Sequence, residues 1–335
     1  MPHSIAENAR AVLLPAFDGM GLSDPVLRFL DGGGVSILLG ETRQEYVARQ
    51  MSEDRRQSET AETFRRVTDV ARARAGGLLA FVDQEMGGIC RLHDLVPALP
   101  AAIDLPHSTA QEIEDIAFRV AGMAAAMGVN GFLAPVVDVL TGRNDWLHGR
   151  TWSTDPELIG HLSAAYVRGV QRGGVHATVK HFPGFGATTA DPAIVAEAVN
   201  PLTLTQVEAA FPAFQRPIDA GAAFVMVGPA IVAALDPEQP ALRSGKIVSL
   251  LRQRFGFKGI VMADDLDSKA TMRGDSVAQV ALDALRAGCD FLLLADIGTQ
   301  LDAVANAIAT AAERGEISAE ALAASADRLR GLARA

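Results

Sequence analysis

The 335-residue sequence has little cysteine, few aromatic side chains and no long apolar stretch. Its two cysteines, Cys90 and Cys289, lie far apart without the spacing of a zinc cluster, so no zinc site is expected and no disulfide is required. No apolar stretch reaches the roughly 18 residues of a membrane span, and the first residues lack the charged and then apolar pattern of a secretion signal. We therefore expect a cytoplasmic protein with no membrane partner.

The sequence also lacks basic runs and cofactor motifs. Its 30 Lys and Arg residues against 40 Asp and Glu residues give a formal net charge of −10, which argues against nucleic acid as a partner. There is no Gly-rich phosphate loop of the GxxxxGK[ST] or GxGxxG type between a strand and a helix, and no His pair at helical spacing beside an acid. We expect neither a cofactor nor a metal.

Against these absences, 49% of the residues are hydrophobic, which suffices for a large core. Short apolar, β-branched runs alternate with longer amphipathic segments. Near-continuous apolar runs joined by helices are typical of a parallel sheet buried on both faces. The eight runs cover residues 11–17, 35–39, 78–82, 132–139, 177–182, 223–227, 259–263 and 291–295. This pattern predicts one (β/α)₈ barrel domain over residues 1–335, with a doubly wound open sheet as the alternative.

Polar side chains gather where several of these runs end. Asp83, Asp138, Lys180 with His181, and Asp264 each lie at the end of such a run. In a (β/α)₈ barrel the carboxyl ends of the strands form the active-site face, so we expect these groups to meet there. A single Asp after a strand more often caps a helix, and we interpret Asp265 and Asp296 in that way.

The same segments resemble glycoside hydrolase family 3, and among its members the single-domain bacterial β-N-acetylglucosaminidases of cell-wall recycling. The resemblance runs in order from about residue 11 to residue 295. It is carried by the segments 82–85 (VDQE), 134–138 (APVVD), 149–152 (GRTW), 180–186 (KHFPGFG) and 256–266 (GFKGIVMADDL).

The resemblance implies a retaining glycosidase with carbohydrate as its partner and no cofactor. Asp264 matches the family's nucleophile, which attacks the anomeric carbon to form a covalent glycosyl-enzyme. Asp83 matches a carboxylate that binds sugar hydroxyls. Arg91, Arg150, Lys180 and His181 match the groups that hold the terminal sugar. We expect that sugar to be a β-linked N-acetylhexosamine or a close relative.

This sequence also departs from the family pattern in the loop after the fifth run. Asp191 keeps the position of the residue that orients the general acid/base, but Ala193 stands where the catalytic His is expected. Other expected groups are missing as well: Phe185 replaces an imidazole, Gly88 replaces an Arg, and Gly228-Pro229 replaces Ser-His.

Three interpretations of these departures stay open. A surrogate acid such as Asp191 or His148 serves the reaction, or the reaction has changed to one whose leaving group or acceptor needs no His. Alternatively, the protein binds sugar without catalysis. We favour an enzyme, because a binding protein has no special need of a carboxylate beneath the anomeric carbon. The sequence predicts no oligomeric state.

Overall fold

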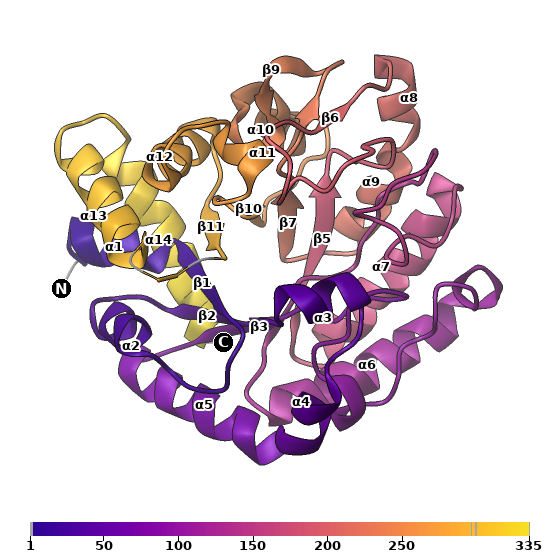
Figure 1. Ribbon diagram of the computed structural model, residues 1–335, viewed down its shortest axis with the longest axis horizontal. Helices are drawn as coiled ribbons and strands as arrows, with labels where there is room; N and C mark the ends of the chain where they lie inside the picture. The colour runs from indigo at the N-terminus through magenta and orange to yellow at the C-terminus, as the bar shows by residue number, and fades with distance from the viewer. Residues whose placement is uncertain (1–2, 296, 299, 335) are drawn as a thin grey trace.

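The computed structural model describes residues 3–295, 297–298 and 300–334. Eight parallel strands close into a barrel in the order β1-β11-β10-β7-β5-β4-β3-β2, with helices around it (Figure 1). The predicted (β/α)₈ barrel is confirmed, and the open doubly wound sheet is not. The barrel strands are β1 (Leu13–Phe17), β2 (Ser36–Leu39), β3 (Leu79–Val82), β4 (Gly131–Phe132), β5 (His176–Phe182), β7 (Phe224–Val227), β10 (Ile260–Ala263) and β11 (Phe291–Leu294).

Each of the eight apolar runs overlaps one barrel strand, but the fourth run, residues 132–139, overlaps the two-residue strand β4 only at Phe132. Strand β4 ends at Phe132, and Pro135 follows within the same run. Because proline has no backbone N–H, it cannot donate to a sheet ladder. Pairing resumes beyond it only as an isolated bridge between Val136 and Lys180.

The helices cover the outside of the barrel, and several begin with a side-chain cap. Thr60 accepts a hydrogen bond from the N–H of Thr63 at the start of α5, which satisfies an otherwise free donor of the first turn. The helices are α1 (Ile5–Ala11), α2 (Asp24–Asp31), α3 (Arg43–Ala48), α4 (Glu53–Ser58), α5 (Ala61–Ala75), α6 (Ala110–Ala126), α7 (Pro156–Arg172), α8 (Leu204–Ala209), α9 (Phe211–Asp219), α10 (Gly245–Gln253), α11 (Lys269–Met272), α12 (Val277–Ala287), α13 (Gln300–Glu313) and α14 (Ala319–Arg334). Among the described residues, no helix has the length and apolar character to cross a membrane.

A small second sheet lies beside the barrel. It pairs β6 (Val199–Asn200) with β8 (Ile231–Val232) in parallel, and β8 with β9 (Asp236–Pro240) in antiparallel orientation. It joins the loops that follow β5 and β7 on one side of the barrel (Figure 1).

Three fully buried phenylalanines pack together in the core. The ring centroids of Phe81 and Phe224 lie 5.3 Å apart, and that of Phe291 lies 6.0 Å from Phe81. Phe224 and Phe291 are the first residues of β7 and β11, so this layer fills the interior at the amino ends of those strands. The open space of the barrel is left to the carboxyl ends, where the predicted site residues lie.

Candidate active site

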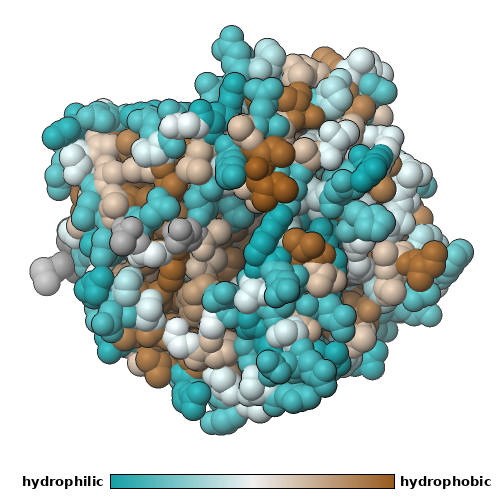
Figure 2. Space-filling model, in the orientation of Figure 1, coloured by the Kyte–Doolittle hydropathy of each residue, from teal (hydrophilic) through white to brown (hydrophobic). Residues whose placement is uncertain are grey.

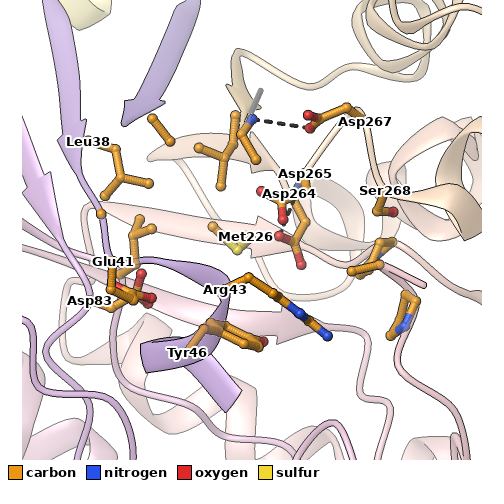
Figure 3. A pocket seen from close by; sticks show the side chains of 18 of the residues that line it. Leu38, Glu41, Arg43, Tyr46, Asp83, Met226, Asp264, Asp265, Asp267 and Ser268 are labelled. Carbon is orange, nitrogen blue, oxygen red and sulfur yellow. Dashed lines mark hydrogen bonds between the residues drawn. The ribbon is translucent and has the colours of Figure 1, made fainter. Parts of the chain in front are cut away.

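A cavity of about 560 Å³ lies at the carboxyl ends of the barrel strands. The face shown in Figure 2 is hollowed near its centre, and Figure 3 shows side chains that line the cavity. Six of the seven predicted site residues line it: Asp83, Arg150, Lys180, His181, Asp191 and Asp264. The structure therefore brings together groups that lie up to 181 positions apart in the sequence.

Asp264 directly follows β10 and is 8% exposed. Its N–H donates to the carbonyl of Val227 on the neighbouring strand at 3.0 Å, which fixes the start of the loop. Its Oδ1 accepts the N–H of Asp265 at 2.8 Å. In the described part of the chain no basic side chain forms an ion pair with Asp264, so this carboxylate faces the cavity without a neutralising partner.

Asp265 also lines the cavity, and its side chain lies next to Asp264 in Figure 3. The interpretation of Asp265 as a helix cap is wrong, because Ser268 caps α11 through the N–H of Thr271. Asp296, interpreted in the same way, lies outside the described residues. Burial, followed by the charges of Asp264 and Asp267, raises the pKa of Asp265 well above its ordinary value. Asp265 therefore keeps its proton to a higher pH than an exposed aspartate does.

A buried network of charges forms the base of the cavity. Lys180 Nζ lies 2.6 Å from Asp83 Oδ1 and 2.8 Å from Glu85 Oε1. Arg150 binds Glu85 through two hydrogen bonds of 2.8 and 3.1 Å. Burial favours a raised pKa for Glu85, but the charges of Arg150 and Lys180 outweigh it and hold that pKa far below its ordinary value. The network holds both cations in place at the base of the cavity.

His181 is held in one orientation. Its ring Nδ1 lies 2.8 Å from Asp138 Oδ2, and the other oxygen of Asp138 accepts the N–H of Phe185 at 2.7 Å. The imidazole packs against Trp146 with ring centroids 4.7 Å apart, and its Nε2 lies 3.4 Å from Arg150. Asp138 is thus a positioning residue that leaves Nε2 directed at the site.

Arg91 is the one predicted site residue that lies outside the cavity. Its guanidinium is fully buried and binds Glu59 through hydrogen bonds of 2.6 and 3.0 Å. Its Nε donates to the carbonyl of Gly40 at 2.6 Å. The prediction that Arg91 holds the sugar is therefore corrected. Arg91 supports the cavity wall behind Gly40 and Glu41.

The loop after β5 brings both Asp191 and Ala193 to the cavity. Asp191 Oδ1 accepts the N–H of Ala193 at 3.0 Å, and its other oxygen forms an ion pair with Arg43. His148 is exposed and does not line the cavity. Of the two surrogate acids considered, only Asp191 is in place, and its carboxylate is already bound by an arginine.

Two of the family departures fit each other in space. Phe185 is fully buried, and a Cβ added at Gly228 would lie 2.2 Å from its ring. The ring thus fills space that a larger residue at position 228 would need. A Cβ at Gly88 would likewise lie 2.2 Å from Glu85 Oε2, inside the Glu85–Arg150 pair.

Sequence reasoning missed the wall formed by the loop after β2 and by α3. Glu41, Arg43 and Tyr46 all line the cavity. The Tyr46 hydroxyl accepts hydrogen bonds from Arg150 at 2.8 Å and from Trp146 at 3.0 Å. Glu41 had the same signal as the predicted carboxylates, because it follows an apolar run by two residues.

Comparison with known proteins bears on this site. The family model described as "Glycosyl hydrolase family 3 N terminal domain" matches residues 36–332. A β-hexosaminidase of Xylella fastidiosa is 35% identical over 225 residues, which are 65% of this chain and 67% of that protein. A β-hexosaminidase of Methylobacillus flagellatus is 30% identical over 71% of each chain.

Solved structures show the same likeness. A family 3 β-N-acetylglucosaminidase from Paenibacillus sp. matches 98% of this chain with a TM-score of 0.87 and 26% identity, and this chain covers 62% of that one. A β-N-acetylhexosaminidase from Beutenbergia cavernae matches with a TM-score of 0.83 and 25% identity, covering 98% of this chain and 97% of that one.

Proposed function

Because this chain belongs to glycoside hydrolase family 3, we propose that it is a retaining glycosidase acting on a terminal β-linked N-acetylhexosamine or a close relative. The β-hexosaminidase names of its relatives support the sugar class. The observation that carries the proposal is the position of Asp264, a carboxylate without a cationic partner, which shares one cavity with Asp83, Lys180, Arg150 and His181.

In the proposed reaction Asp264 attacks the anomeric carbon of the terminal sugar. The bond from that carbon to the aglycone oxygen breaks, and the sugar stays on Asp264 as an ester. Water then attacks the same carbon, which releases the sugar and restores the carboxylate. Asp83 accepts hydrogen bonds from sugar hydroxyls while Lys180 and Arg150 donate. Lys180 is held by Asp83, and Arg150 is held by Glu85.

Protonation of the leaving oxygen is the step that this cavity supports least. The side chain of Ala193 has no acidic group that could protonate the leaving oxygen, and the carboxylate of Asp191 is bound by Arg43. General acid help is worth about 10² to 10⁴ in rate. We therefore propose that the enzyme releases leaving groups that are stable as anions far faster than it releases a second sugar.

The test is turnover of an aryl β-N-acetylglucosaminide with a good leaving group, beside a natural β-linked disaccharide. Wild-type protein is compared with Asp264→Asn and with Asp69→Asn, an exposed aspartate on α5 that serves as the matched control. Aryl turnover that falls by about three orders of magnitude in Asp264→Asn, but not in Asp69→Asn, would support the proposed nucleophile.

A sugar-binding protein without catalysis is the second candidate, and Ala193 is the observation that favours it. That candidate predicts measurable sugar binding with no turnover of either substrate. It also predicts that Asp264→Asn leaves the rate of both reactions at background.

A further inference from the structure

Glu41 is a carboxyl group in the cavity that lacks a partner. It follows β2 by two residues and lies beside Asp83 in the wall of the cavity (Figure 3). Its Oε2 is buried and has no hydrogen-bond partner within the described structure. Buried polar oxygens in folded proteins are nearly always satisfied. Glu41 is therefore a carboxyl group at the cavity wall whose hydrogen bonding the protein's own side chains, within the described residues, leave incomplete.

The charged groups around Glu41 offer it no partner. Of the two nearby cations, Lys180 is bound by Asp83 and Glu85, and Arg91 is bound by Glu59 and Gly40. Burial, followed by the charge of Asp83, raises the pKa of Glu41 to about 8 despite the opposing charge of Arg91. Without a ligand, Glu41 therefore holds a proton at neutral pH.

The cavity as a whole carries an excess of acid. Seven carboxyl groups line it against three Lys and Arg side chains, and the acid remains in excess when Glu41 and Asp265, both with a raised pKa, are counted as neutral. Each of the three Lys and Arg side chains already forms an ion pair with a carboxylate of the protein. The carboxylates do not form a metal site, because no group of three or more potential metal ligands comes together among the described residues. The charge thus favours a cationic organic ligand over a neutral one.

Resting on the proposed glycosidase reaction, and choosing a close relative of N-acetylhexosamine as its sugar, we infer that the terminal sugar taken by this cavity carries a free, positively charged amino group, which Glu41 binds. On binding, the ammonium donates a hydrogen bond to the Glu41 carboxylate, and Glu41 releases its proton to solvent. The Glu41 carboxylate, which lacked a hydrogen-bond partner, then accepts a charge-assisted hydrogen bond from the sugar. An N-acetylated sugar is neutral and gains nothing from this carboxylate.

Calorimetric binding at neutral pH tests the inference. The ligands are D-glucosamine, 6-amino-6-deoxy-D-glucose, D-glucose and N-acetyl-D-glucosamine. Titrations in two buffers of different ionisation enthalpy count the protons released. The proteins are wild type, Glu41→Gln, and Glu313→Gln as the matched control at an exposed glutamate on α13.

We expect one of the amino sugars to bind wild type about tenfold or more tightly than either neutral sugar, a difference of about 1.4 kcal/mol. Binding should release about one proton per sugar. Glu41→Gln should abolish both the preference and the proton release, whereas Glu313→Gln should keep both. Because Gln mimics a protonated Glu in shape, Glu41→Gln should unfold thermally at or above the wild-type temperature, which shows that the fold is intact.

Equal or tighter binding of the neutral sugars, or a preference for amino sugars that survives Glu41→Gln, would overturn the inference. Turnover separates it from the proposed function. If the aryl β-N-acetylglucosaminide is hydrolysed through Asp264 and no amino sugar is preferred, the inference alone fails. If the preference depends on Glu41 but neither an aryl β-glucosaminide nor its N-acetyl counterpart is hydrolysed, the inference holds and the proposed glycosidase function fails.

Discussion

Two residues that line the same cavity decide which chemistry this site supports. Asp264 offers a carboxylate that forms no ion pair with a cation among the residues described, and the methyl side chain of Ala193 has no proton to donate. Asp191 accepts the N–H of Ala193 at 3.0 Å, so the two residues lie side by side at the cavity. A longer side chain at position 193 would therefore have the Asp191 carboxylate next to it.

Ala193→His should restore general acid catalysis. A histidine at this position faces the cavity and has Asp191 beside it as an orienting carboxylate. We expect turnover of a β-linked disaccharide to rise about a hundredfold, the lower end of the usual gain from general acid catalysis. Formation of the glycosyl-enzyme from a substrate with a good leaving group should change little. An equal gain in the rate of glycosyl-enzyme formation from both substrates, or no gain for the disaccharide, would show that position 193 does not face the leaving oxygen.

Gly228 and Phe185 should be energetically coupled. Gly228→Ala should destabilise the fold by about 1–3 kcal/mol in urea unfolding, because its Cβ would meet the Phe185 ring. In the background of Phe185→Ala, which removes that ring, the same change should cost far less. Additive effects in this double-mutant cycle would contradict the contact.

The sequence could predict those site residues that directly follow a strand. Asp83 and Asp264 each come straight after an apolar run, so the barrel pattern alone places them on one face. Arg91 was misplaced because its partner, Glu59, lies 32 residues away, and no local pattern reveals that pairing. No local pattern reveals the ion pair between Arg43 and Asp191 either, because these residues lie 148 positions apart.

At the scale of elements, the segment between β2 and β3 is held together by buried ion pairs. Arg55 links Glu45 to Glu59, with N to O distances of 2.8 and 2.7 Å, and Glu59 in turn binds Arg91. These pairs tie α3 and α4 to the wall that carries Glu41. The short helices owe their position to this network more than to apolar burial, since α4 has no buried residue.

Glu59→Gln should destabilise the fold by about 3 kcal/mol at neutral pH, because it leaves the buried Arg91 without its carboxylate. Burial favours a raised pKa for Glu59, but the imidazole of His93 at 3.7 Å, the hydrogen bonds from Arg91 and the charges of Arg91 and Arg55 lower the pKa from 4.5 to about 2. The stability that this group adds is thus complete above pH 4.5 and is lost as pH falls toward 2. Urea unfolding of wild type and variant across this range tests both points. A stability difference that does not shrink with acid would contradict them.

The barrel strands were predictable because each is a compact apolar run, whereas the small second sheet was not. Strands β6 and β8 have two residues each, too few to show any periodicity. Their pairing depends on the loops after β5 and β7 being brought together by the barrel. Such elements follow from the tertiary fold and not from local sequence.

At the scale of the whole molecule, one buried aspartate links helix α14 to the barrel, beside other contacts such as the hydrogen bond from the Leu78 N–H to the Ala333 carbonyl. Asp290, just before β11, binds Ser325 and Arg328 of α14. It also accepts hydrogen bonds from Arg252 at 2.8 Å and from the N–H of Val261 at 3.0 Å. One buried carboxylate thus connects α10, α14 and the strands β10 and β11.

Asp290→Ala should lower the free energy of unfolding by about 3 kcal/mol, since it leaves the partly buried Arg252 and the N–H of Val261 without their acceptor. Hydrogen exchange should show the loss of protection concentrated in α14. Sugar binding by the folded protein should be unchanged, because Asp290 does not line the cavity. Uniform loss of protection over the whole barrel would contradict a local fastening role.

The most direct test of the account is mass spectrometry of the protein during turnover of an activated aryl β-hexosaminide. Without a base at position 193, hydrolysis of the glycosyl-enzyme should be slow, so the intermediate should accumulate. We predict a burst of about one aryl alcohol per protein and one sugar residue on the peptide that contains Asp264. Turnover without a burst in which no sugar is found on that peptide, or the same labelling in Asp264→Asn, would contradict the central claim that Asp264 is the nucleophile of a retaining glycosidase.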